Sequence, residues 1–181
     1  TLGVANELEG GTNLINGRLR LASVNTTAGF GKSINVNEGA IDFCIDNTSS
    51  SYAEVTTPII LNGNSVDVYT SRYTYWTSPM TGTGDINIYC GGERSYMGHQ
   101  KKKEQPDWSA YTGTVTLYPY KDVISTAGFY GLVFEGNKTF SPEDYSINRT
   151  NHVFEHCKVI ATDGTALATE SNDRGVCIGE L

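Results

Sequence analysis

Four short segments of this 181-residue chain repeat one pattern: residues 41–44 (IDFC), 66–69 (VDVY), 86–89 (INIY) and 115–118 (VTLY). Each segment runs apolar, short polar, apolar and then a larger residue, and successive copies begin 25, 20 and 29 residues apart. Alternation with period two indicates a strand with one buried face. Self-similarity at about 20 to 30 residues is typical of a solenoid, whose stacked coils share a continuous apolar column. The pattern therefore predicts strands on four successive coils.

The composition favours the same fold class. The chain contains 11 Tyr and 20 Gly, together with many Val, Ile, Thr and Asn residues, which suit pleated strands and tight turns. No window shows a helical period, so we expect an all-β protein with very little helix. A lectin-like or jelly-roll β-sandwich is the alternative fold, although its strands usually recur every 8 to 12 residues or so.

The negative net charge of the chain argues against one class of partner. A formal net charge of −7 argues against a nucleic-acid partner, because phosphate backbones bind basic surfaces. The one basic run, at residues 101–103, is followed at once by Glu104 and is expected to be a solvated loop. The sequence contains no run of about 18 apolar residues, so no membrane-spanning helix is predicted.

The sequence leaves the disulfide state open. Free thiols and two disulfides fit it equally well for the four cysteines, Cys44, Cys90, Cys157 and Cys177.

Other segments resemble known repeat proteins. Residues 16–21 (NGRLRL), 25–31 (NTTAGFG) and 34–43 (INVNEGAIDF) resemble one coil of autotransporter-passenger-like proteins, which form a right-handed parallel β-helix. Further stretches are similar to secreted bacterial β-helix proteins that are related in shape to pectate-lyase-like solenoids: residues 80–89, 92–98 and 107–115. These motifs are mostly turn and strand patterns, so they indicate a fold more than an activity.

The resemblance implies a secreted or cell-surface β-helix with an adhesive or glycan-contacting, non-catalytic role. Residues 1–181 are expected to form one solenoid domain, with a long loop insertion at about 91–113. Because the last residues read as the middle of a strand, either the chain is a fragment of a longer β-helix or another polypeptide covers that end.

The repeat also predicts a binding surface. Strands of a parallel stack lie about 4.8 Å apart, so outward tyrosines on successive coils would form a flat aromatic strip about 10 Å long. Such a strip, beside carboxylates and amides, could bind a glycan. The predicted outward residues are Asp42, Asp67, Asn87 and Thr116 in one row and Tyr69, Tyr89 and Tyr118 in the next. Alternatively, these tyrosines stack on one another for stability. Within the insertion, Arg94, Tyr96 and Trp108 are expected to contact the same ligand.

Catalytic interpretations have less support, and the sequence leaves enzyme activity open. A polysaccharide lyase would need Ca²⁺ held by several converging carboxylates, and Asp42 and Asp67 alone are few; no other cofactor is predicted. A glycoside hydrolase and a carbohydrate-binding module are further alternatives. Residues 152–156 (HVFEH) match a zinc-protease motif that requires a helix. On a strand, His152 and His156 would lie about 13 Å apart, so no metal site is predicted.

Overall fold

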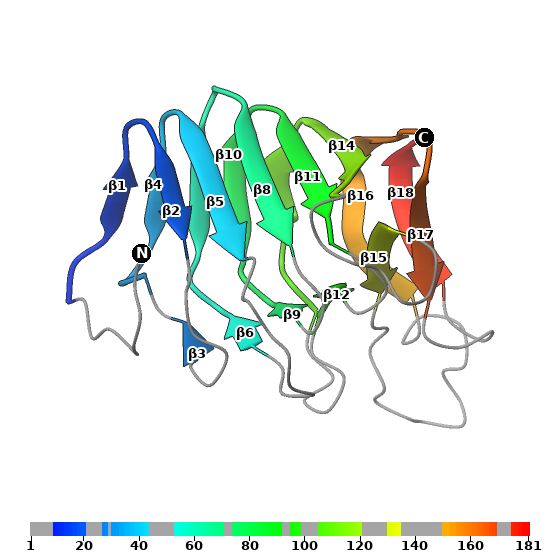
Figure 1. Cartoon of the computed structure of the whole chain (residues 1–181), viewed down its shortest axis with the longest axis horizontal. Helices are drawn as coiled ribbons and strands as arrows, with labels where there is room; N and C mark the ends of the chain where they lie inside the picture. The colour runs from blue at the N-terminus through cyan, green and yellow to red at the C-terminus, as the bar shows by residue number, and fades with distance from the viewer. Residues whose placement is uncertain are drawn as a thin grey trace.

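The computed structural model describes residues 9–20, 27–28, 30–43, 53–70, 74–91, 95–98, 105–120, 130–134, 150–169 and 175–181. Within these ranges the chain is all-β, and its strands form three sheets in which every strand pair is parallel (Figure 1). The prediction of an all-β chain is confirmed. The described residues contain no helix that is long and apolar enough to cross a membrane.

Consecutive strands belong to different sheets, and neighbouring strands within a sheet are two or three places apart in chain order. The five-stranded sheet contains β1 (Thr12–Leu14), β4 (Ile34–Val36), β7 (Ile59–Asn62), β10 (Met80–Thr83) and β13 (Ala110–Thr112). The seven-stranded sheet contains β2 (Arg18–Arg20), β5 (Gly39–Phe43), β8 (Val66–Thr70), β11 (Ile86–Cys90), β14 (Thr114–Pro119), β16 (Thr150–Ala161) and β18 (Gly175–Glu180). The six-stranded sheet contains β3 (Thr27–Ala28), β6 (Ala53–Val55), β9 (Thr74–Trp76), β12 (Ser95–Met97), β15 (Tyr130–Phe134) and β17 (Thr165–Thr169).

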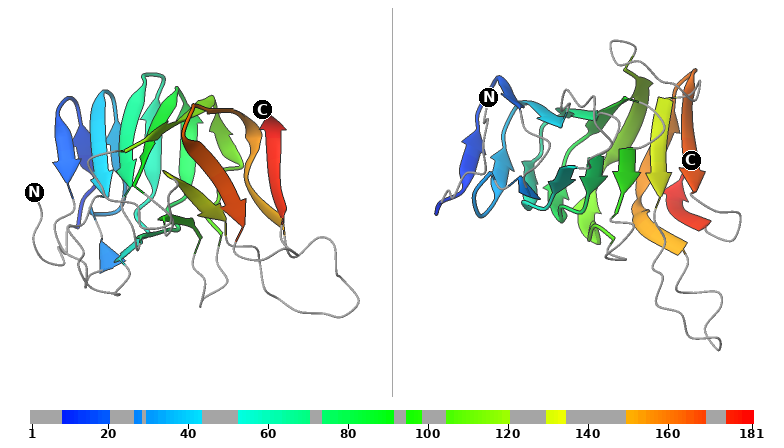
Figure 2. Two further views of the ribbon diagram at one scale, coloured as in Figure 1. Left: turned by 45° about the vertical axis from the view of Figure 1, so that its right-hand side comes forward. Right: turned by 60° about the horizontal axis from the view of Figure 1, so that its bottom comes forward.

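The strands of each sheet follow one another side by side along the molecule, as two further views show (Figure 2). A jelly-roll or lectin-like sandwich is built from antiparallel sheets. The uniformly parallel pairing of the described strands therefore argues against the sandwich alternative.

Apolar alternation builds the core, as the sequence predicts. In β8 and β11 every second side chain is buried, beginning with Val66 and Ile86. These two residues are in register with Val115 of β14, so branched apolar side chains form a column across three strands. Such columns belong to one continuous hydrophobic cluster. Each strand thus buries its inward face against its neighbours, which a single repeat could not do alone.

Tight corners join the five-stranded and seven-stranded sheets, and glycine makes them possible. Gly39, at the start of β5, has a φ of 117°, and Gly84, just before β11, has a φ of 132°. At both positions an added Cβ would collide with backbone of the preceding corner, at Gly17 and Asn64 respectively. Only glycine satisfies both the positive φ and this close approach.

The predicted register of β5 is wrong by two residues. Asp42 is level with Tyr69, whereas Asp67 is level with Ala40. The remaining alignment is correct, because Asp67, Asn87 and Thr116 are successive partners on β8, β11 and β14. Alternation has a period of two, so a slip of two residues leaves every side chain on its expected face and cannot be detected from the pattern.

The stretch 91–113, expected as a loop insertion, contains two paired strands, β12 and β13. Beside them, Trp108 is only 2% exposed, and its indole N–H donates to the Ser78 carbonyl oxygen at 3.2 Å. Its ring lies 5.2 Å from that of Trp76 and 5.4 Å from that of Phe154. An aromatic core therefore supports this part of the molecule.

Cys90 and Cys157 are buried free thiols. Burial raises the pKa of Cys90 to about 12 and that of Cys157 to about 11, so both stay protonated at neutral pH. Cys44 and the side chain of Cys177 lie outside the described residues.

Candidate functional site: a tyrosine ladder and a polar groove

The first candidate surface is a ladder formed by Tyr69, Tyr89 and Tyr118 on the outer face of the seven-stranded sheet. The three residues are successive partners on β8, β11 and β14, as predicted. The ring centroids of Tyr69 and Tyr89 lie 4.5 Å apart with 9° between their planes. Those of Tyr89 and Tyr118 lie 5.3 Å apart with 23° between the planes. We call these three residues the tyrosine ladder.

The rings face one another rather than solvent, so the expected flat aromatic strip does not form. The other ring face of Tyr69 is also occupied, because the guanidinium carbon of Arg18 lies 4.1 Å from its centroid. The ring centroid of Tyr120 lies 5.2 Å from that of Tyr69, with 64° between the two planes, in an edge-to-face contact. The reason is geometric: strand spacing is close to the distance at which aromatic rings stack, so rings standing upright on the sheet pack against each other. A sugar would therefore meet ring edges and hydroxyls along most of the ladder.

Polar side chains accompany the ladder. Asn87 donates from Nδ2 to Asp67 Oδ1 at 3.0 Å, and its Nδ2 lies 3.4 Å from Ser65 Oγ. The pKa of Tyr89 is raised, first by burial and then by the nearby Asp67 carboxylate, which disfavours a second negative charge. The backbone of Asp42 is in β5 one row away from this pair, but its side chain is outside the description.

The residues predicted from the 91–113 stretch are not on one open surface. Tyr96 is buried, and its ring lies 5.4 Å from that of Tyr75 on the outer side of the six-stranded sheet. Trp108 belongs to the aromatic core, as described above. Arg94 lies outside the described residues.

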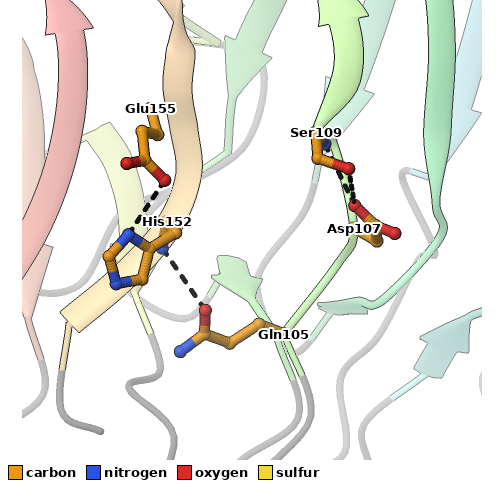
Figure 3. A network of polar contacts seen from close by, with 5 residues as sticks. All are labelled: Gln105, Asp107, Ser109, His152 and Glu155. Carbon is orange, nitrogen blue, oxygen red and sulfur yellow. Dashed lines mark hydrogen bonds and ion pairs between the residues drawn. The ribbon is translucent and has the colours of Figure 1, made fainter. Parts of the chain in front are cut away.

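The second candidate surface is a cavity of about 240 Å³ between residues 105–109 and β16. We call it the polar groove. Its lining residues are Gln105, Pro106, Asp107, Trp108, Ser109, His152, Glu155 and His156. A hydrogen bond joins the two walls: the backbone N–H of His152 donates to Gln105 Oε1 at 3.3 Å (Figure 3).

An irregularity in β16 supplies one wall of the polar groove. The pairing of β16 with β18 shifts register between Asn151 and Phe154 and again between Phe154 and Lys158. In a regular strand, residues three apart point to opposite faces. Here His152 and Glu155 share the outer face, and His152 Nδ1 lies 3.1 Å from Glu155 Oε2. His156 is also exposed, so the irregular strand turns three polar side chains toward the groove.

The motif at residues 152–156 lies entirely within a strand, as the sequence analysis expected. Among the residues that the structure describes, no group of three His, Cys, Asp or Glu side chains could hold a metal ion.

The opposite wall carries a carboxylate held in place by a local turn. Asp107 Oδ1 accepts hydrogen bonds from Ser109 Oγ at 2.7 Å and from the Ser109 backbone N–H at 3.0 Å. These two hydrogen bonds hold the pKa of Asp107 below its usual range. The bond from the Ser109 hydroxyl contributes more than the bond from its backbone N–H. Asp107 is therefore ionised at neutral pH and fixed in orientation at the groove.

The polar groove combines several hydrogen-bonding groups with an apolar wall. Carboxylates, an amide, a hydroxyl and two imidazoles can accept or donate hydrogen bonds, while Pro106 and Trp108 are buried apolar lining residues. The sequence does not predict this groove, although Trp108, one of the residues predicted to contact a ligand, lines it. The motif at 152–156 matches only a zinc-protease pattern, and nothing in the sequence places it beside residues 105–109.

No protein-family model matches this chain, and no curated protein matches its sequence.

Proposed function

We propose that the chain forms a single right-handed parallel β-helix domain and is related to autotransporter-passenger-like and pectate-lyase-like solenoid proteins. The parallel pairing, and the regular rotation of strands β1 to β15 among three sheets, support this fold. We also propose that the protein is secreted or lies at the cell surface. Strand β18 is the last strand of the seven-stranded sheet in the described chain, and we propose that further polypeptide pairs with its outer edge.

We further propose that the protein contacts glycans without catalysing a reaction, and that the polar groove is its main contact. The supporting observation is the groove itself, in which hydrogen-bonding side chains from two separate elements surround one cavity. Binding sites of this kind combine an apolar wall with a few convergent polar groups. A sugar ring has the matching chemistry, with hydroxyls around its rim and C–H groups on its faces. At about 240 Å³ the cavity is below the roughly 300 Å³ of a small drug site, which suits one sugar unit.

The tyrosine ladder has a secondary part in this proposal. Its hydroxyls, together with Asp67 and Asn87, could contact a glycan chain along the sheet, and the proposed contacts of Asp42, Arg94, Tyr96 and Trp108 remain predictions. The stacked geometry makes the ladder mainly a stabilising element.

The experiment is a glycan array probed with the full chain, followed by calorimetric titration of the best glycan. His156→Ala removes a groove side chain that lines the cavity, and we expect it to weaken binding about fivefold, the size of one lost hydrogen bond. Tyr118→Ala, at the end of the ladder, is the comparison variant for the secondary contact and should weaken binding less than His156→Ala does, by no more than about twofold. Failure of every glycan to bind would reject the proposal. Loss of binding in Tyr118→Ala but not in His156→Ala would move the site to the ladder.

A carbohydrate-active enzyme is the second candidate, because two carboxylates occupy opposite walls of the groove (Figure 3). Glycoside hydrolases use a pair of Asp or Glu residues on either side of the scissile bond. This candidate predicts release of reducing ends that is abolished in Glu155→Gln. A lyase would instead release unsaturated ends and depend on Ca²⁺. Binding without turnover supports the non-catalytic role.

A further inference from the structure

We propose that the polar groove selects a sugar unit that carries a protonated amine. The inference rests on the proposed glycan contact and adds the chemical class of the ligand. It starts from the charges of the lining residues: the only formally charged side chains that line the described groove are Asp107 and Glu155, and both are carboxylates.

The two carboxylates come from opposite walls and retain unused acceptor capacity. Asp107 receives both of its hydrogen bonds from Ser109 on one oxygen, Oδ1. Glu155 contacts His152 through Oε2. In the described part of the molecule, the second oxygen of each carboxylate is left for a ligand, because an ionised carboxylate accepts on both oxygens.

None of the described lysine and arginine side chains lines the groove, and the imidazole of His152 contacts Glu155 from the same strand. Lys158, the next outward residue beyond His156 on β16, is directed to the neighbouring strand, where its Nζ lies 2.6 Å from Glu180 Oε1. With the histidines neutral, as the formal charge counts them, the described lining therefore carries two negative charges and no positive one, and the chain as a whole carries a formal charge of −7. A uronate would be repelled, whereas an ammonium group would be attracted.

An ammonium group also matches the hydrogen-bonding pattern. It donates three hydrogen bonds and accepts none, so it complements the acceptor-only carboxylate of either wall. Charge-assisted hydrogen bonds are about twice as strong as neutral ones. The N-acetylated form of the same sugar loses the charge and two of the three donors, so the structure should discriminate between an amine and its acetamide.

The test compares three probes by titration calorimetry with the full chain, at a pH where the sugar amine is protonated. The probes are a glucosamine trisaccharide, its fully N-acetylated form and a galacturonic acid trisaccharide. We expect the amine form to bind about tenfold more tightly than the N-acetylated form, and the uronate form to bind most weakly. Raising the salt from about 0.05 M to about 0.5 M should reduce this preference, because the attraction is screened.

Variants connect the preference to the groove. Asp107→Asn and Glu155→Gln should each lower affinity for the amine form about fivefold or more, while affinity for the N-acetylated form changes by less than about twofold. Asp163→Asn is the matched control, since it removes the same charge from an exposed turn that does not line the groove. Glu155→Gln keeps the inference testable if Asp107→Asn disturbs the local turn.

The outcomes separate the two proposals. Equal affinity for amine and N-acetylated sugars, or tighter binding of the uronate, would overturn the charge selection and leave glycan binding intact. Loss of amine preference in Asp163→Asn as well as in the groove variants would place the effect in the overall charge rather than in the groove. Failure of all three probes, together with an empty glycan array, would overturn the proposed function itself.

Discussion

The tyrosine ladder and the polar groove are built in opposite ways. The ladder arises from regularity, because equivalent residues of three repeats lie in register on β8, β11 and β14. The groove arises from irregularity, because β16 shifts its register and residues 105–109 form no strand. Regular stacking satisfies the ring faces internally, whereas the irregular segments leave polar groups turned toward a cavity. In this molecule, repetition stabilises the fold, and its interruption creates the candidate site.

The largest expected effect tests the support of the groove. Phe154 is fully buried in β16, with its ring 5.4 Å from Trp108 and 5.5 Å from Phe134. Phe154→Ala should lower the free energy of unfolding by about 3–5 kcal/mol, because it leaves a large cavity in the aromatic core. Urea denaturation measures this loss, and Phe154→Leu, which fills more of the space, should cost clearly less. A loss below about 1 kcal/mol would mean that the groove does not depend on this core.

An intermediate effect tests the ladder. Tyr89 stacks on the rings of both Tyr69 and Tyr118, whereas Tyr118, at the end of the ladder, stacks on the ring of Tyr89. Each stacked pair contributes about 0.5–1.5 kcal/mol beyond the buried area, so Tyr89→Ala should cost about 1–3 kcal/mol and Tyr118→Ala about half as much. Thermal or urea unfolding provides the measurement, with Tyr89→Phe as a control that keeps the ring. Equal losses for the two alanine variants would show that stacking is not what the ladder contributes.

The smallest effect concerns the groove carboxylate and its pH dependence. The hydrogen bonds from Ser109 favour ionised Asp107, so their contribution to stability is present above the usual carboxyl pKa and is lost as the pH falls through the lowered pKa. Ser109→Ala removes the hydroxyl donor and should raise the pKa of Asp107 toward its ordinary value. An NMR titration of the carboxyl carbon follows this change directly. The free energy of unfolding should change by no more than about 0.5 kcal/mol, because the site is exposed. An unchanged pKa would show that the hydroxyl does not hold the carboxylate.

The repeat segments carried enough information to predict much of the fold. Val66, Val68, Ile86 and Ile88 were expected to point inward from parallel strands, and all four are buried. The alignment of Tyr69, Tyr89 and Tyr118 was also correct. The pattern did not predict the register of β5. A shift of two residues leaves the alternation unchanged, and such a shift separates Asp42 from Asp67. The pattern also failed for ring orientation, because the side-chain torsions that stack the tyrosines are decided by their neighbours.

Sequence alone determined the strand faces and the glycine corners, because each depends on residues close together in the chain: alternation sets which side is buried, and a positive φ requires glycine. Tertiary structure decided the groove. Gln105 and His152 are 47 residues apart, and they meet only because two segments lie side by side. The shifted register of β16 then determines which of its side chains face the polar groove. That register depends on how β16 packs against β18 and the aromatic core.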